Sequence, residues 1–353
     1  MTDSENCYID RRDIVGGTSE ATAAVQVARK AQFASVASTP ARTSQASSGH
    51  QVEISFLQID HDLTLRRMVV HAPSSRGTVL FLHGFPETLY AWKDISIALA
   101  DEYEVHAFDW PGYGLSSRPS AERFSYAPRE YARVLDEYIS TAGIEKSMLT
   151  IYATDIGALP ALLLALDNPE IARRLIVGDF APFDRPAHMY DSLQKLKAGP
   201  AMDQVRAFMN KNREEILQNT FTRGLPEEAR YRISQEFSDD AAKGWSQGEI
   251  TTVDAFAHYY SHFTRDQDYL ESHLAKLNTP VKVLWGEKDL YISKQSGVEF
   301  ADRVHAELTV LPGIGHYPHL QDPQRTVAEV RASFGSRATP VVSQPGRTSA
   351  DVQ

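Results

Sequence analysis

The chain has almost no cysteine, no long apolar run and no run of basic residues. Its 353 residues include a single cysteine, Cys7, which excludes a framework of internal disulfides and favours a reducing compartment. No apolar stretch reaches the roughly 18 residues that a membrane span requires. The first 50 residues lack the apolar core of a signal peptide. The expected location is therefore cytoplasmic.

Positive charge is also in the minority. The chain carries 36 Lys and Arg against 46 Asp and Glu, which gives a formal net charge of −10. An acidic balance without a basic cluster argues against nucleic acid or an anionic membrane surface as a partner. With 42% hydrophobic and 23% charged residues, the composition is that of a soluble globular protein.

Short apolar runs alternate with stretches of helical periodicity over most of the chain. After a hairpin over 52–70, strands are expected at 78–82, 104–108, 174–178, 281–285 and 306–311, and one more directly before residue 155. Helices are expected at about 128–139 and 323–334. Apolar strands that alternate with helices predict an α/β fold with a mostly parallel sheet, covered by helices on both faces.

The pattern changes over residues 183–275, where apolar residues recur only at helical spacing. This segment is predicted to be an all-helical cap, inserted between two parts of the α/β core at 51–182 and 276–336. Residues 1–50 and 337–353 are rich in small and polar residues. Both are expected to be disordered, because they cannot bury enough apolar surface to offset their ordering entropy.

One stretch combines an apolar strand, a turn of small residues and an apolar helix. It reads Ala153-x-Asp155-x-Gly157, and small flanking residues suit a tight turn that lifts the central side chain above the sheet. The layout is that of a nucleophile elbow, with aspartate in place of the usual serine. A carboxylate can displace a leaving group from an sp³ carbon and form an alkyl ester, which water then hydrolyses. The alternative is an ordinary strand–loop–helix in which Asp155 caps the helix.

Four further motifs accompany the elbow in a fixed order. They are His83-Gly84-Phe85-Pro86-Glu87, the turn over 109–117, Gly286-Glu287-Lys288-Asp289 and Gly315-His316. Together the five motifs resemble the α/β-hydrolase fold with a helical cap, specifically the epoxide hydrolase and haloalkane dehalogenase branch, over residues 52–336. The resemblance implies a hydrolase without cofactor or metal. Its expected substrate is a small apolar or amphipathic organic molecule, and the expected state is a monomer or homodimer.

The resemblance also implies a catalytic triad. Asp155 is the expected nucleophile, His316 the base that activates water, and Asp289 the acid that orients His316. Some members of the branch take the acid from the end of the strand before the cap, where this chain has Asp179. His319 is the competing candidate for the base.

The backbone N–H groups of Phe85 and Ile156 are the expected oxyanion hole. Neither side chain donates a hydrogen bond to a departing halide, which favours an epoxide as the substrate. Epoxide opening needs an acid from the cap, for which Tyr260 is the better match and Tyr259 the next. The alternative is that both tyrosines only pack against the sheet.

A further ring-opening residue is expected early in the cap, where Tyr190 and Lys195 are the candidates. The sequence thus predicts hydrolysis of an epoxide to a vicinal diol. The alternatives are a haloalkane or haloacid dehalogenase and, in another class, a non-catalytic ligand-binding protein of the same fold.

Overall fold

The computed structural model describes residues 50–197 and 199–335 of the chain. The expected disorder of residues 1–50 and 337–353 therefore concerns segments that lie outside these ranges, except for His50. Among the described helices, none combines the length and the apolar character needed to cross a membrane.

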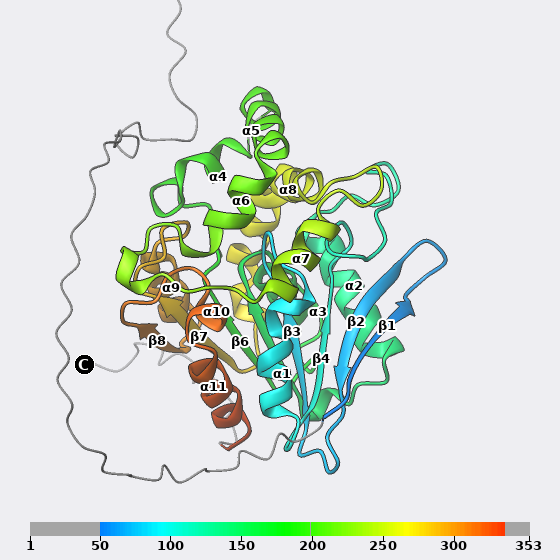
Figure 1. The fold of residues 1–353 in the computed structure, drawn as a ribbon. Coiled ribbons are helices and arrows are strands. Elements are labelled where there is room, and N and C mark those ends of the chain that lie inside the picture. Colours follow the sequence, from blue (N-terminus) through cyan, green and yellow to red (C-terminus); the bar gives the residue numbers. More distant parts are fainter. Residues whose placement is uncertain (1–49, 198, 336–353) are drawn as a thin grey trace, which may run out of the picture. The chain divides into compact units, whose positions relative to one another are not determined.

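An eight-stranded sheet forms the centre of the described part (Figure 1). The strands are β1 (Val52–Gln58), β2 (Thr64–Val70), β3 (Thr78–Leu82), β4 (Glu104–Phe108), β5 (Leu149–Thr154), β6 (Arg174–Gly178), β7 (Val281–Gly286) and β8 (Glu307–Leu311). Their order is β1-β2-β4-β3-β5-β6-β7-β8. The pairs that involve β2 are antiparallel, and all the others are parallel. This is the mostly parallel α/β sheet that the apolar runs predict.

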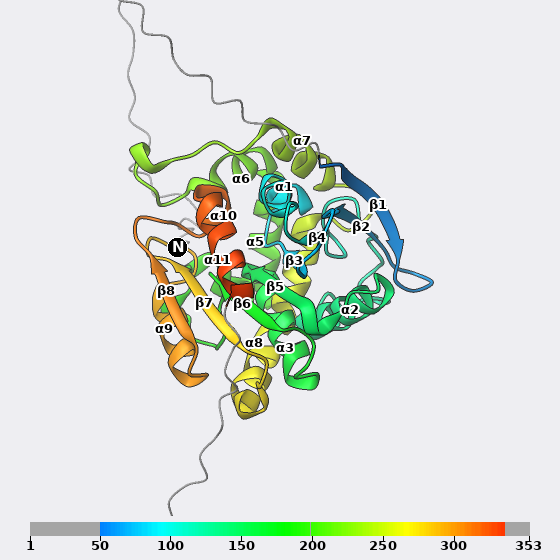
Figure 2. The same ribbon diagram turned by 90° about the horizontal axis from the view of Figure 1, so that it is seen from below.

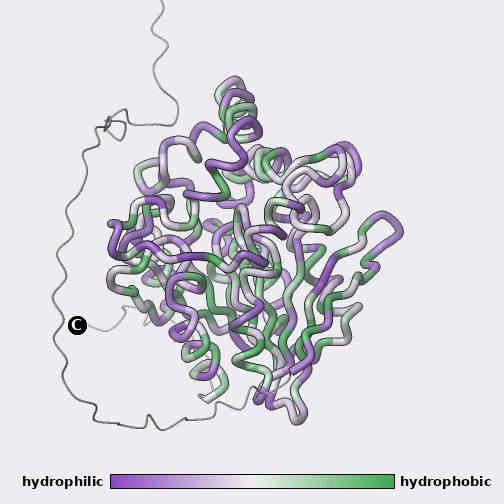
Figure 3. The backbone as a smooth tube through the Cα atoms, in the orientation of Figure 1, coloured by the Kyte–Doolittle hydropathy of each residue, from purple (hydrophilic) through white to green (hydrophobic). Residues whose placement is uncertain are grey.

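Helices cover both faces of this sheet (Figure 2). One face carries α1 (Lys93–Leu99), α10 (Pro318–Gln321) and α11 (Pro323–Gly335), and the other carries α2 (Pro128–Thr141), α3 (Ala158–Asp167) and α9 (Lys294–Arg303). The central strands are buried on both sides as a result, and every residue of β5 is buried. The apolar segments accordingly gather in the strands, with polar residues on the outer loops (Figure 3).

The chain leaves the sheet after β6 and returns in β7, and the helices between them lie over the carboxyl ends of the strands (Figure 1). They are α4 (Asp191–Lys195), α5 (Gly199–Lys211), α6 (Arg213–Asn219), α7 (Gln235–Gly244) and α8 (Thr252–His273). Within the described residues of this insertion there is no strand, only a single bridge between Met189 and Ile292. The insertion is helical, as the periodicity predicts, while its limits at 183 and 275 stay predictions.

A buried arginine joins the insertion to the sheet. Arg66 of β2 donates from Nε to Asp109 at 2.6 Å and from both terminal nitrogens to Asp240 of α7 at 2.7 and 2.6 Å. Asp109 also accepts backbone N–H groups from Leu89 and Leu115, so its carboxylate organises the turn that follows β4. Buried charges are tolerated when they are paired and hydrogen-bonded in this way. The network fixes α7 over the end of the sheet.

Candidate active site

The turn after β5 places Asp155 at the apex of a sharp bend. Asp155 has a φ of 48°, in the left-handed region that non-glycine residues rarely adopt. The 3-10 turn η4 (Asp155–Gly157) and helix α3 follow directly. Gly84 approaches the bend so closely that a Cβ there would lie 2.6 Å from the Cβ of Asp155. Strain of this kind persists where the surroundings enforce it, and it is concentrated at functional sites.

The two carboxylate oxygens of Asp155 have different partners. Oδ1 accepts the backbone N–H of Phe85 at 2.7 Å. Oδ2 lies 3.5 Å from Nε2 of His316, and the Asp155 side chain is 13% exposed. One oxygen is thus held by a backbone donor, while the other faces the imidazole. The Phe85 N–H is in the place predicted for an oxyanion donor, and Ile156 follows Asp155 at the start of η4.

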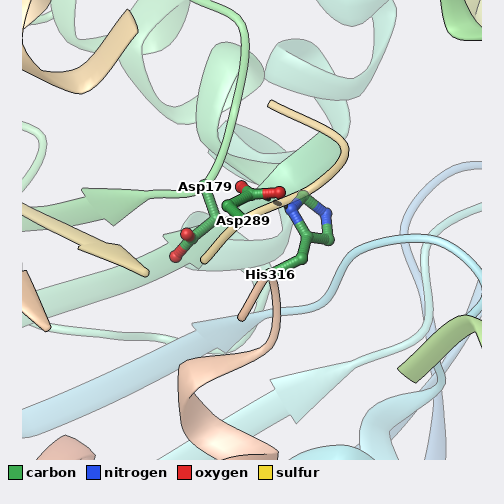
Figure 4. Close-up of side chains that lie close together, drawn as sticks. All are labelled: Asp179, Asp289 and His316. Atoms are coloured by element: carbon green, nitrogen blue, oxygen red, sulfur yellow. Dashed lines mark hydrogen bonds and ion pairs between the residues drawn. The ribbon is translucent and has the colours of Figure 1, made fainter. Parts of the chain in front are cut away.

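His316 lies between two carboxylates. Its Nδ1 is 2.8 Å from Oδ2 of Asp289, and the dashed line in Figure 4 marks this contact. The other oxygen of Asp289 accepts the N–H groups of Tyr291 and Ile292 at 2.8 and 3.0 Å. The structure therefore brings Asp155, His316 and Asp289 together in the order that a nucleophile, base and orienting acid require.

The charges around His316 determine its protonation. Burial alone would lower the pKa of its imidazole, but the charges of Asp289 and Asp155 and the hydrogen bonds to both raise it well above the usual value. Both carboxylates therefore favour the protonated ring while Asp155 is ionised. A change in the charge of Asp155 would alter the pKa of His316 directly.

Asp179, the alternative acid, lies beside this pair at the end of β6 (Figure 4). It is 1% exposed, and its Oδ1 accepts the N–H of Gly286 at 2.9 Å. Burial and the nearby charge of Asp289 raise the pKa of Asp179 well above its usual range. Asp289, not Asp179, makes the hydrogen bond to His316. The geometry thus favours Asp289 as the orienting acid, while burial favours the protonated form of the Asp179 carboxyl.

The same three side chains have ligand atoms within 4.8 Å of one another, a spacing that a metal ion could use. Asp289 already accepts two backbone N–H groups on one oxygen and faces His316 with the other. Both oxygens of Asp289 are therefore already engaged by hydrogen bonds. This arrangement suits proton transfer through His316.

The insertion brings aromatic side chains over Asp155. Tyr260 of α8 is buried, and burial together with the charge of Asp155 raises the pKa of its hydroxyl well above the usual value. It is therefore protonated and available as a donor. Among the described residues its hydroxyl has no recorded hydrogen-bond partner, whereas the Tyr259 hydroxyl donates to the carbonyl of Ile156 at 3.1 Å. The Tyr259 hydroxyl is thus engaged by the elbow, and the choice of Tyr260 as the acid stays a prediction.

Tyr190 and Lys195, the candidates for a further ring-opening residue, have different surroundings. The ring of Tyr190 lies 5.9 Å from that of Tyr291, which in turn packs 5.1 Å from His316. Tyr190 is thus one ring away from the histidine. Lys195 pairs with Asp191 on the same helix at 2.9 Å.

Two tyrosines near the site do not stand out in the sequence. Tyr113 is fully buried, and its hydroxyl has no partner among the described residues. Burial and the charge of Asp155 raise its pKa well above the usual value. The Tyr317 hydroxyl donates to the carbonyl of Phe85 at 2.8 Å. Their positions inside the turn at 109–117 and directly after His316 are the only signals that could have pointed to them.

The chain is similar to known proteins over most of its length. Residues 79–330 match the family described as the alpha/beta hydrolase family. Haloalkane dehalogenase 2 of Mycobacterium tuberculosis is 25% identical over 266 residues, which cover 73% of this chain and 87% of that protein. The uncharacterized hydrolase YugF of Bacillus subtilis is 21% identical over 254 residues, which cover 71% of this chain and 86% of that protein.

Solved structures share the fold. The haloalkane dehalogenase DbeA from Bradyrhizobium elkani superposes with a TM-score of 0.66 at 21% identity, covering 81% of this chain and 98% of that one. The epoxide hydrolase CorEH also gives a TM-score of 0.66, at 20% identity over 81% of this chain and 99% of that one.

Proposed function

Because the chain belongs to the alpha/beta hydrolase family, we propose that it hydrolyses an epoxide through an alkyl ester on Asp155. The observation that carries the proposal is that the two carboxylate oxygens of Asp155 have different partners. One accepts a backbone N–H at 2.7 Å, and the other is free to attack and faces His316 at 3.5 Å. A serine would be needed for ordinary acyl transfer, and the apex of this elbow is a carboxylate.

In the first step, Oδ2 of Asp155 attacks a ring carbon of the epoxide, and the carbon–oxygen bond of the ring breaks. The Tyr260 hydroxyl gives its proton to the departing alkoxide. In the ester Asp155 is neutral, so His316 gives up its proton more readily and becomes available as a base. In the second step His316 takes a proton from water, and the water oxygen attacks the ester carbonyl. Negative charge then develops on Oδ1, where the N–H of Phe85, together with that of Ile156, stabilises it. Collapse breaks the bond between the carboxyl carbon and Oδ2, which leaves as the second hydroxyl of the diol with the remaining proton of the water. The water oxygen stays in the carboxylate of Asp155, and the proton on His316 returns to the tyrosine.

The aromatic side chains beside Asp155 support a small apolar or amphipathic substrate. Phe85 stacks on Phe256 of α8 with ring centroids 4.1 Å apart, and Phe256 packs on Tyr260 at 4.8 Å. Apolar walls with few polar groups orient small organic ligands by shape, leaving chemistry to the polar groups. Here Asp155 and the Tyr260 hydroxyl are those groups.

Dehalogenation is the second candidate, because one side chain of the insertion favours it. The indole ring of Trp245 lies 6.0 Å from the ring of Phe85, and an indole N–H is a donor that could hold a departing halide. Phe85 itself offers a halide only its backbone N–H. A haloalkane would alkylate the same oxygen of Asp155 and release a halide ion, with no need for the Tyr260 proton.

The test uses His316→Gln, which should slow ester hydrolysis while leaving alkylation possible. The variant is incubated with a panel of epoxides and haloalkanes, and its intact mass and the modified peptide are recorded. An adduct on Asp155 with the mass of a whole epoxide supports the proposal. An adduct equal to a haloalkane less hydrogen halide makes the protein a dehalogenase. Asp155→Asn is the matched control and should form neither adduct; an adduct elsewhere in both variants would refute the mechanism.

A further inference from the structure

We propose that Glu87, His319 and Tyr317 are positioning residues. They hold the backbone N–H of Phe85, the proposed oxyanion donor, in a fixed position relative to the loop that carries His316. The inference rests on the proposed ester mechanism. None of the three touches the reacting atoms. They lie behind the site and connect the segment after β3 with the segment after β8, which meet only in the folded chain.

Glu87 connects the two segments through both of its oxygens. Oε2 accepts the backbone N–H of Gly84 at 2.7 Å, directly before the Phe85 N–H that holds Asp155. Oε1 lies 2.5 Å from Nε2 of His319, and both side chains are fully buried. A hydrogen bond to a carboxylate in a water-free environment is strong and costly to lose. Glu87 thus ties the oxyanion segment to the start of α10.

The orientation of His319 is fixed as well. Its Nδ1 has no hydrogen-bond partner among the described residues, so a proton on that nitrogen would be buried without an acceptor. The proton therefore lies on Nε2 and is donated to Glu87. The ring stacks on Trp92 with centroids 4.1 Å apart, and Trp92 is itself fully buried. His319 is held in one plane with one tautomer, which suits a fixed support and excludes a role as the catalytic base.

Tyr317 makes a second connection from the same loop. It follows His316 directly, and its hydroxyl donates to the carbonyl of Phe85 at 2.8 Å. The Phe85 peptide is therefore restrained on the carbonyl side by Tyr317 and on the amide side by Glu87 through Gly84. A shift of the His316 segment would move the oxyanion donor with it. Base and oxyanion donor keep their relative positions because they share these supports.

This arrangement predicts an effect on one chemical step. The Phe85 N–H matters most when charge develops on Oδ1, which happens during hydrolysis of the ester. During alkylation the carboxylate loses charge, so a displaced donor costs less. Loss of the support should therefore slow ester hydrolysis more than alkylation. A general loss of stability would lower the active fraction and affect both steps alike.

The experiment compares His319→Leu with His106→Leu as the matched control. His106 of β4 is also a buried histidine, bonded through Nδ1 to the Tyr138 hydroxyl at 3.1 Å, and its recorded contacts do not reach the Phe85 segment. Ester formation and decay are followed by quenched intact mass. We expect His319→Leu to slow decay by about 10- to 100-fold and alkylation by less than about threefold, with His106→Leu changing neither. His319→Gln, which can still donate to Glu87, should recover most of the decay rate.

Deuterium exchange of the peptide over residues 83–88 provides a second readout that does not need turnover. It should rise in His319→Leu and stay at the wild-type level in His106→Leu. Equal slowing of both steps, or equal exchange in both variants, would overturn the inference. If His319→Leu does not fold, Tyr317→Phe removes only one oxygen and must show the same selective effect on a smaller scale. A wild type that forms no ester would refute the proposed function instead, and the exchange result would then decide on the positioning role.

Discussion

Replacing Asp155 by Asn should lower the pKa of His316, because it removes one of the two charges that face the imidazole. The change copies the electrostatic effect of ester formation, in which Asp155 becomes neutral. In the free protein the imidazolium is favoured by both carboxylates. In the ester only Asp289 remains charged, so His316 loses its proton more readily. The base would then become available at the stage when water has to be activated.

The distance sets the size of the effect. For two unit charges 3.5 Å apart, the interaction is about 5 kcal/mol at an effective dielectric constant of about 20. Asp155 is partly exposed, so solvent screens part of this interaction. Since one pKa unit corresponds to about 1.4 kcal/mol, we expect the pKa of His316 to fall by about one to three units. The asparagine amide can also donate to Nε2, which favours the neutral ring further.

The pKa is measured by titrating the imidazole nitrogens with proton–nitrogen NMR. The resonances of His316 are identified as those missing from His316→Gln. Asp101→Asn is the control, because it removes the same charge at an exposed site near the opposite end of the strands. It should leave the pKa of His316 unchanged. A shift in Asp155→Asn of less than about half a unit, or a rise, would refute the electrostatic coupling of nucleophile and base.

Two further predictions separate neighbouring residues of the same type. Asp289→Asn should slow ester hydrolysis by about 10²- to 10⁴-fold, whereas Asp179→Asn should keep activity within about tenfold, in single-turnover assays. Because the pKa of Asp179 is raised in the folded state, its contribution to stability is present at acidic pH and is lost as the pH rises toward the folded pKa. The melting temperature of Asp179→Asn minus that of wild type should therefore be higher at pH 8 than at pH 5. An equal difference at both pH values would contradict a neutral carboxyl at Asp179. Tyr260→Phe should slow alkylation by epoxides by about 10²-fold or more and spare haloalkanes, while Tyr259→Phe should spare both; equal losses for the two variants would remove Tyr260 from its role.

The sheet could be predicted from the sequence because its strands are buried on both faces. The apolar runs at 78–82, 104–108 and 174–178 coincide with β3, β4 and β6. Such a strand can be recognised in the sequence because most of its positions are apolar. The elbow could be found for a similar reason, because the small residues around Asp155 mark a bend that larger side chains would block.

The order of strands and the choice between paired candidates depend on geometry that the sequence does not carry. Asp179 and Asp289 both follow strands that are neighbours in the sheet, and only the 2.8 Å contact with His316 favours Asp289 as its partner. Tyr259 and Tyr260 are adjacent on α8, so the rotation of one helix decides which hydroxyl is engaged by the elbow. The contact of Glu87 with His319 joins residues 232 positions apart. Such a contact between distant segments has no local signature.

The insertion leaves and re-enters the sheet between two strands that are hydrogen-bonded neighbours, with Gly178 of β6 opposite Leu284 of β7. If this segment were exchanged during evolution or engineering, the new segment would join the chain at the end of β6 and the start of β7. The register of the sheet would stay intact. The residues that select the substrate could thus be replaced together with the insertion, while Asp155, Asp289 and His316 would remain in the α/β core. Tyr260, the proposed proton donor, would leave with the insertion. A transplanted insertion would therefore change which bonds Asp155, the proposed nucleophile, can break as well as which molecules reach it.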